Sequence, residues 1–212
     1  RVIIVTGAGD KAFASGTDIA QFRAFSGAGD ALAYEERVEG VIGAIERCSV
    51  PTLAAISGAV TGGGAAIALA CDLRIATVTA RFGFPIARTL GNCLSMANYA
   101  RLYALLGPAL VKDIVFTARL VEAEEGRQAG LYSELLPDHA ALMARAAELA
   151  GTIAGHAPLT MRATKEAMRR LTEAAAQGVA GDDLVTLCYT SADFREGMEA
   201  FLAKRAPVWR GR

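Results

Sequence analysis

The fold is decided by one stretch of the sequence, which reads Leu53-Ala-Ala-Ile-Ser-Gly-Ala-Val-Thr-Gly-Gly-Gly-Ala-Ala-Ile-Ala-Leu-Ala-Cys-Asp-Leu73. It predicts an apolar strand over residues 52–57, a turn at Gly58, and an apolar helix over 65–70 that the glycines at 62–64 open. The first N–H groups of a helix have no acceptor within it, and the helix dipole adds partial positive charge there. Because glycines let an anion approach this backbone closely, the stretch indicates a site for an oxyanion or a phosphate. The alternative is a tight strand–helix junction around a buried helix.

A second glycine cluster follows the first strand of the sequence. The β-branched run over residues 2–5 predicts a strand buried on both faces, and Gly7-Ala-Gly9-Asp-Lys-Ala12 then fits a dinucleotide fingerprint with Ala in the last place. Gly16 and Thr17 interrupt the helix that this fingerprint needs, and no acidic residue ends a second strand about twenty positions later. An ordinary strand-to-loop turn is the alternative interpretation. A P-loop is excluded, because no Gly-Lys-Ser/Thr follows either cluster.

The composition indicates one core and no polyanionic partner. The chain has 212 residues, of which 53% are hydrophobic and 21% charged. The 22 Lys and Arg balance the 22 Asp and Glu, so there is no electrostatic footprint for nucleic acid or an anionic membrane, and self-association is unopposed. The four cysteines lie far apart and form no zinc or redox motif, which fits a reduced, cytoplasmic protein. No metal site is expected, and neither histidine adjoins a nucleophile motif.

Strands alternating with helices predict an α/β fold with a helical C-terminal third. We expect a core over residues 1–137 and a helical region over 138–212. Asp30 is expected to cap a long helix that runs to about Arg47, and Pro108 to occupy a first helical turn. Further strands are expected over 72–77, 80–84 and 131–136, and C-terminal helices over 138–155, 158–177, 182–191 and 193–205.

Three segments together resemble the enoyl-CoA hydratase/isomerase (crotonase) family. The stretch over 53–73 is similar to the family signature throughout its length. The segment Lys11-Ala-Phe-Ala-Ser-Gly-Thr-Asp-Ile19 resembles the family's Ala-Phe-Ser-Ala-Gly-Ala-Asp-Ile, and Phe194–Arg205 resembles its C-terminal helix. The resemblance implies a spiral of β-β-α units, with a helical C-terminal region that supports homotrimers or hexamers. It also implies that the first strands of the spiral precede Arg1 and are missing here.

The resemblance further implies an acyl-CoA substrate, with coenzyme A as part of the substrate and no separate cofactor. Backbone N–H groups of Thr17 and Gly63 are expected to form an oxyanion hole for the thioester oxygen of an enolate. The coenzyme and its thioester are expected to contact residues of the loop, of the glycine triplet and of the C-terminal helix of a neighbouring subunit: Ser15, Asp18, Ile19, Ala20, Gly62, Phe201 and Lys204.

Two departures from the family put its usual reaction in question. Hydratases carry glutamates at two positions that are Ala66 and Ile86 here, so the acyl pocket is expected to be apolar where acid–base carboxylates normally lie. Arg88 and Asn92 are the polar candidates nearby. Three hypotheses remain: a family enzyme with a non-standard reaction, a malonyl-type acyl-CoA decarboxylase, which needs no base to begin, or a non-catalytic acyl-CoA-binding protein.

Overall fold

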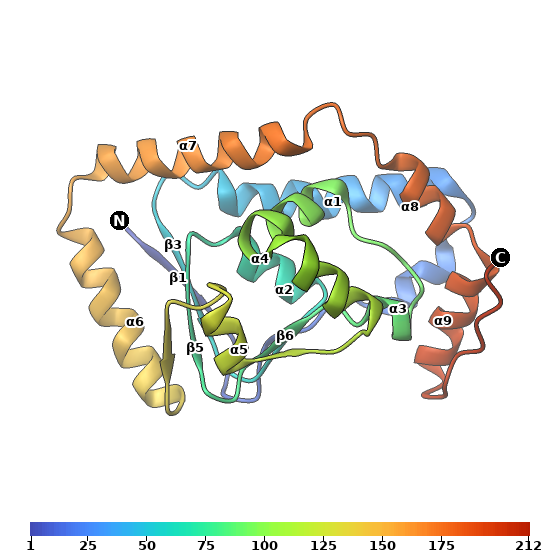
Figure 1. Ribbon diagram of the computed structural model, residues 1–212, viewed down its shortest axis with the longest axis horizontal. Coiled ribbons are helices and arrows are strands. Elements are labelled where there is room, and N and C mark those ends of the chain that lie inside the picture. The colour runs from blue at the N-terminus through green and yellow to red at the C-terminus, as the bar shows by residue number, and fades with distance from the viewer.

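The computed structural model describes residues 1–212, and its strands form two four-stranded sheets (Figure 1). In the first sheet every neighbouring pair is parallel, and the order is β1 (Ile3–Thr6), β3 (Thr52–Ile56), β5 (Leu73–Thr77) and β8 (Glu134–Leu136). The second has the order β2 (Ala12–Ala14), β4 (Ala59–Thr61), β6 (Arg81–Gly83) and β7 (Val121–Glu122), with only β7 antiparallel to its neighbour. The α/β class predicted from the sequence is confirmed.

Strand β3 is the centre of the molecule, and all its residues are buried. Side chains alternate between the two faces of a strand. Ala54 and Ile56 therefore join the central core with helix α2 (Gly63–Ala70), while Leu53 and Ala55 pack with helix α6 (His139–Ala154) on the other face. Burial on both faces explains why the strand reads as a continuous apolar run.

Strand β1 departs from the prediction of burial on both faces. It pairs with β3 alone and forms the edge of its sheet, and the Ile3 side chain is 46% exposed. The β-branched run was sufficient to predict the strand, because it favours extended backbone. The same run of residues does not predict which other elements cover the strand.

Helices cover the sheets and extend beyond them at both ends. They are η1 (Ile19–Ala24, a 3₁₀ helix), α1 (Ala28–Glu46), α3 (Ile86–Thr89), α4 (Met96–Phe116), α5 (Ala123–Gln128), α7 (Pro158–Ala176), α8 (Asp182–Tyr189) and α9 (Ala192–Leu202). Figure 1 shows α7 running along the top of the view near α1, whereas α8 and α9 lie at the right, where they pack on α1 and η1. No helix combines the length and the apolarity needed to cross a bilayer.

One helix start differs in detail from the prediction, and another agrees with it. Gly27 is the N-cap of α1, and Asp30 lies within the first turn, where its carboxylate accepts hydrogen bonds from the Ser26 N–H and hydroxyl. In α4 the backbone leaves helical geometry at Gly107, which has φ of 69°, so Pro108 begins a second helical segment as its fixed φ favours.

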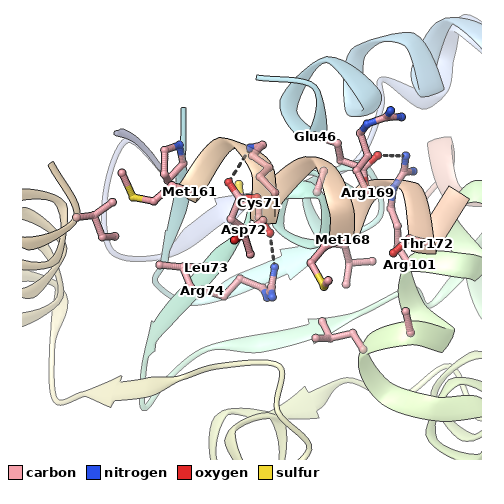
Figure 2. A pocket seen from close by; sticks show the side chains of 18 of the residues that line it. Glu46, Cys71, Asp72, Leu73, Arg74, Arg101, Met161, Met168, Arg169 and Thr172 are labelled. Carbon is pink, nitrogen blue, oxygen red and sulfur yellow. Dashed lines mark hydrogen bonds and ion pairs between the residues drawn. The ribbon is translucent and has the colours of Figure 1, made fainter. Parts of the chain in front are cut away.

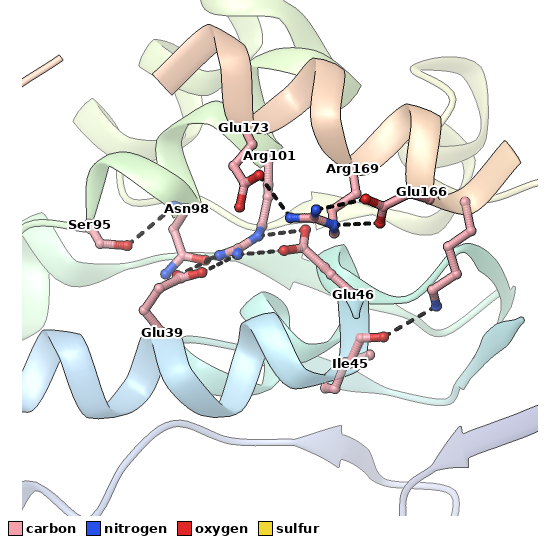
Figure 3. A network of polar contacts seen from close by, with 10 residues as sticks. Glu39, Ile45, Glu46, Ser95, Asn98, Arg101, Glu166, Arg169 and Glu173 are labelled. Atoms are coloured by element: carbon pink, nitrogen blue, oxygen red, sulfur yellow. Dashed lines mark hydrogen bonds and ion pairs between the residues drawn. The ribbon is translucent and has the colours of Figure 1, made fainter. Parts of the chain in front are cut away.

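A buried guanidinium joins α1 to α4. The Arg101 side chain is 6% exposed and forms ion pairs with Glu39 and Glu46, both on α1, while also donating to the Asn98 side chain at 3.0 Å. Figure 3 shows this network beside Arg169 of α7, which pairs with Glu166 and Glu173. A buried charge needs such partners, because desolvation without them is strongly unfavourable.

We predict that Arg101→Met lowers the free energy of unfolding by about 3 kcal/mol, because Glu39 and Glu46 lose their only cation while most of the apolar stem is kept. Urea denaturation measures this. The matched control is Arg127→Met, which breaks an exposed pair with Glu124 and should cost about 0.5 kcal/mol or less. Equal losses in the two variants would contradict the importance of the buried network.

Candidate oxyanion site

The Ser15–Thr17 loop lies directly on the N-terminus of α2. The Gly64 N–H donates to the Ser15 carbonyl oxygen at 3.1 Å, which ties the loop to the first turn of the helix. Gly62 precedes the helix with φ of 55°, a left-handed conformation that favours glycine. The glycine triplet therefore sets both the turn into α2 and its contact with the loop.

The close approach of the two segments requires that side chains be absent. A Cβ at Gly64 would lie 2.2 Å from the Ala14 carbonyl oxygen, and one at Gly62 would lie 3.2 Å from the Gly16 Cα. A Cβ at Gly63 would meet only ordinary contacts, the nearest at 3.7 Å. Gly64 is thus needed for packing, whereas a methyl group at Gly63 would fit in ordinary van der Waals contact with Gly16 and Thr17.

Two backbone N–H groups lie close together where the loop meets the helix. A Cβ built on Gly63 would lie 3.9 Å from the Thr17 nitrogen, and one built on Gly16 would lie 3.5 Å from the Gly63 nitrogen. The Thr17 N–H donates no hydrogen bond within the chain. Gly63 is the first residue of α2, so its N–H has no acceptor in the helix, and the helix dipole adds partial positive charge. Such a pair of donors has the character needed to stabilise an oxyanion.

The side chain of Thr17 turns toward α1. Its hydroxyl lies 2.6 Å from the Tyr34 hydroxyl. Tyr34 belongs to a cluster of aromatic rings, here called the aromatic cluster, that joins η1, α1, α8 and α9 and consists of Phe22, Phe25, Tyr34, Tyr189 and Phe194. The threonine branch thereby anchors the loop to this cluster.

The other loop residues predicted to contact coenzyme A follow Thr17. Asp18 caps η1 by accepting from the Ala20 N–H at 3.0 Å, and Ile19 is half-buried against the aromatic cluster. Ser15 and Ala20 are exposed. Their contact with the coenzyme stays a prediction.

The two positions that depart from the family are both buried among apolar groups. Ala66, in the second turn of α2, packs against Ile42 of α1 and Ala70. Ile86, at the start of α3, belongs to the central core. Neither position carries a carboxylate, as the sequence already shows.

The remaining candidates belong neither to the Ser15–Thr17 loop nor to the glycine triplet. Arg88 is exposed and forms no ion pair with this chain, and Phe201 and Lys204 are exposed at the end of α9 and just beyond it. Asn92 is half-buried, and its amide donates to the Tyr189 hydroxyl at 3.2 Å and to the Cys93 carbonyl at 3.3 Å. Its Oδ1 atom is buried without a partner.

A groove of about 650 Å³ opens at the opposite end of α2. Figure 2 shows it between the residues that follow α2 and helix α7. Its charged groups are already engaged: Lys165 binds Asp72 at 2.6 Å, and Arg74 donates to the Cys71 carbonyl at 2.5 Å. Because the groove lies at the end of α2 and Gly63 lies at its start, the groove is distinct from the oxyanion site.

Sequence reasoning missed three residues near the Thr17 loop: Tyr34, Glu35 and Tyr189. One signal was available for Glu35, because it lies on the face of α1 that also carries Ala31 and Ile42, both buried. Acidic side chains are seldom buried without a partner, so an acidic residue in an apolar helical stripe indicates a specific interaction. Tyr189 offered no local signal.

The fold is an α/β arrangement of two sheets, and its glycine-rich helix start and the adjoining loop carry two backbone N–H groups without partners in the chain. Comparison with known proteins agrees with this fold. The family described as enoyl-CoA hydratase/isomerase matches residues 1–212, and the chain belongs to that family.

Individual relatives extend the comparison. A crotonyl-CoA hydratase from Syntrophomonas wolfei is 34% identical over 97% of this chain and 78% of its own length. Among solved structures, a methylmalonyl-CoA decarboxylase has a TM-score of 0.89 at 29% identity, covering 100% of this chain and 82% of its own. An enoyl-CoA hydratase/carnithine racemase from Magnetospirillum magneticum has a TM-score of 0.76 at 32% identity, covering 100% and 79%.

We predict that Gly64→Ala lowers the free energy of unfolding by about 3 kcal/mol, because the new methyl group would overlap backbone atoms of Ala14 that cannot move independently. Gly63→Ala is the matched control and should cost about 1 kcal/mol or less, since its Cβ meets only ordinary contacts. Chemical denaturation of the two variants measures the difference. A Gly64→Ala protein as stable as Gly63→Ala would contradict the packing described here.

Proposed function

We propose that this acyl-CoA enzyme holds the thioester oxygen of its substrate between the N–H groups of Thr17 and Gly63 while that oxygen carries enolate charge. The observation that carries the proposal is the adjacency of these two donors, one without a partner in the chain and the other at a helix start. Such donors act where charge develops in the transition state. Each is worth about 2.7–4 kcal/mol.

We further propose that the reaction is decarboxylation of a malonyl-type thioester. The C–C bond to the carboxylate breaks, its electron pair enters the enolate, and CO₂ leaves, so no base is needed to begin. Buried Ala66 and Ile86 leave no carboxylate at either family position, which disfavours hydration and isomerisation by the usual route. The likeness in fold to a methylmalonyl-CoA decarboxylase, with a TM-score of 0.89, supports the same reaction class.

A hydratase is the second candidate, because a relative that is 34% identical is a crotonyl-CoA hydratase. It would require a proton-transfer group that replaces the two missing glutamates. Decarboxylation requires a proton only after the C–C bond has broken. The two candidates are separated by comparing CO₂ release from methylmalonyl-CoA with hydration of crotonyl-CoA, and we expect the former to be faster.

We predict that Gly63→Pro lowers kcat/KM for methylmalonyl-CoA by about 10²–10³-fold, since it removes the N–H donor at a first helical position, where proline is otherwise accepted. Gly63→Ala retains the N–H and should keep activity within about tenfold, which corresponds to about 1.4 kcal/mol. Steady-state CO₂ release measures both. Thermal melts establish that the two variants are equally folded.

Three results would count against this function. Equal activities of the Pro and Ala variants would remove Gly63 from the oxyanion site. Hydration of crotonyl-CoA that exceeds CO₂ release would favour the hydratase. Binding of acyl-CoA with no turnover of either thioester would indicate a non-catalytic binding protein.

A further inference from the structure

The Glu35 carboxyl group on α1 is held by a residue of α8, which is in turn held by a residue that follows α3. The Tyr189 hydroxyl on α8 donates to Glu35 Oε1 at 2.5 Å, and the Asn92 amide donates in turn to that hydroxyl at 3.2 Å. Glu35 Oε2 makes no hydrogen bond within the chain. One oxygen of the carboxyl is therefore fixed in place, and the other is free to carry a proton.

The position of Glu35 relates it to both the oxyanion donors and the missing carboxylates. It follows Tyr34, whose hydroxyl contacts the Thr17 side chain at 2.6 Å. One helical turn later, Val38 packs against both the aromatic cluster and the group of residues that contains Ala66. Glu35 therefore directly follows the residue that contacts Thr17, and it lies one turn before Val38, which packs near Ala66.

The surroundings shift the pKa of this carboxyl upward. Burial raises the pKa of Glu35, and the nearby Glu39 carboxylate acts in the same direction, while the Tyr189 hydrogen bond opposes them. The aromatic rings of Tyr34 and Tyr189 stand next to one another, with centroids 6.3 Å apart. A carboxyl with a raised pKa is better suited than a free glutamate to serve as a proton donor to a carbanion.

We propose that Glu35 is the acid that protonates the α-carbon of the substrate enolate, with Tyr189 as its positioning residue. The inference rests on the proposed function. After CO₂ leaves, the enolate electron pair forms a C–H bond with the Glu35 proton, the carbonyl is restored, and the resulting carboxylate regains a proton from water. The N–H groups of Thr17 and Gly63 hold the thioester oxygen throughout. The negative charge on that oxygen falls when the α-carbon is protonated, because the carbonyl group then re-forms.

Exchange of the α-hydrogens of propionyl-CoA in D₂O tests this step without C–C cleavage, because it runs the same proton transfer in reverse. Glu35→Gln keeps the size of the side chain and an oxygen that can accept from Tyr189. It is expected to slow exchange at least 100-fold with the dissociation constant for propionyl-CoA unchanged, since general acid–base groups contribute about 10²–10⁴-fold. CO₂ release from methylmalonyl-CoA is expected to fall less than tenfold, because that step needs no proton.

Two further variants keep the test decisive. Glu36→Gln alters the neighbouring carboxylate, which is exposed, and should exchange at the wild-type rate. Tyr189→Phe removes the positioning hydroxyl and should slow exchange by about tenfold while Glu35 remains. If the Glu35→Gln protein does not fold, exchange by Tyr189→Phe at the wild-type rate overturns the proposal.

The outcomes distinguish this proposal from the function on which it rests. Wild-type exchange by Glu35→Gln overturns the role of Glu35 while leaving enolate chemistry intact. Equal losses of exchange and CO₂ release in Glu35→Gln would show a structural role and would likewise overturn it. A wild-type protein that binds no acyl-CoA and performs neither reaction would contradict the proposed function itself.

Discussion

The site depends on one contact, the hydrogen bond from the Gly64 N–H to the Ser15 carbonyl. It joins the loop that follows β2 to the start of the helix that follows β4, and these two strands are paired neighbours in the second sheet. The contact forms only because the helix start lacks side chains, and the Cβ of any other residue at Gly64 would overlap the loop backbone. Since the same contact brings the Thr17 nitrogen beside Gly63, packing and the proposed chemistry have a common cause.

The C-terminal helices complete the surroundings of this contact. Tyr189 and Phe194 bring α8 and α9 into the aromatic cluster, on which Thr17 is anchored through Tyr34. The loop is thus held from the helix side by backbone and from the opposite side by aromatic packing. Preorganised donors are effective because they need not reorganise when charge develops. The stability of α8 and α9 on α1 is therefore expected to matter for turnover as well as for folding.

The sequence predicted the α/β class and the longer elements because glycines and apolar periodicity are local signals. Strand β3 and helix α2 lie within two residues of their expected bounds. It did not predict β2, β4 or β7, which have two or three residues each and show no periodicity. The candidate donors at Thr17 and Gly63 came from a resemblance. The hydrogen bond between Tyr189 and Glu35 joins residues that are 154 positions apart, so no local sequence pattern could predict it.

A crystal structure of the protein with a non-reactive acyl-CoA thioester analogue is the sharpest test of the proposed oxyanion hole. We predict that the thioester oxygen lies about 2.7–3.1 Å from the backbone nitrogens of both Thr17 and Gly63. A thioester oxygen more than about 3.5 Å from either nitrogen, or an acyl group seated in the groove at the other end of α2, would contradict it.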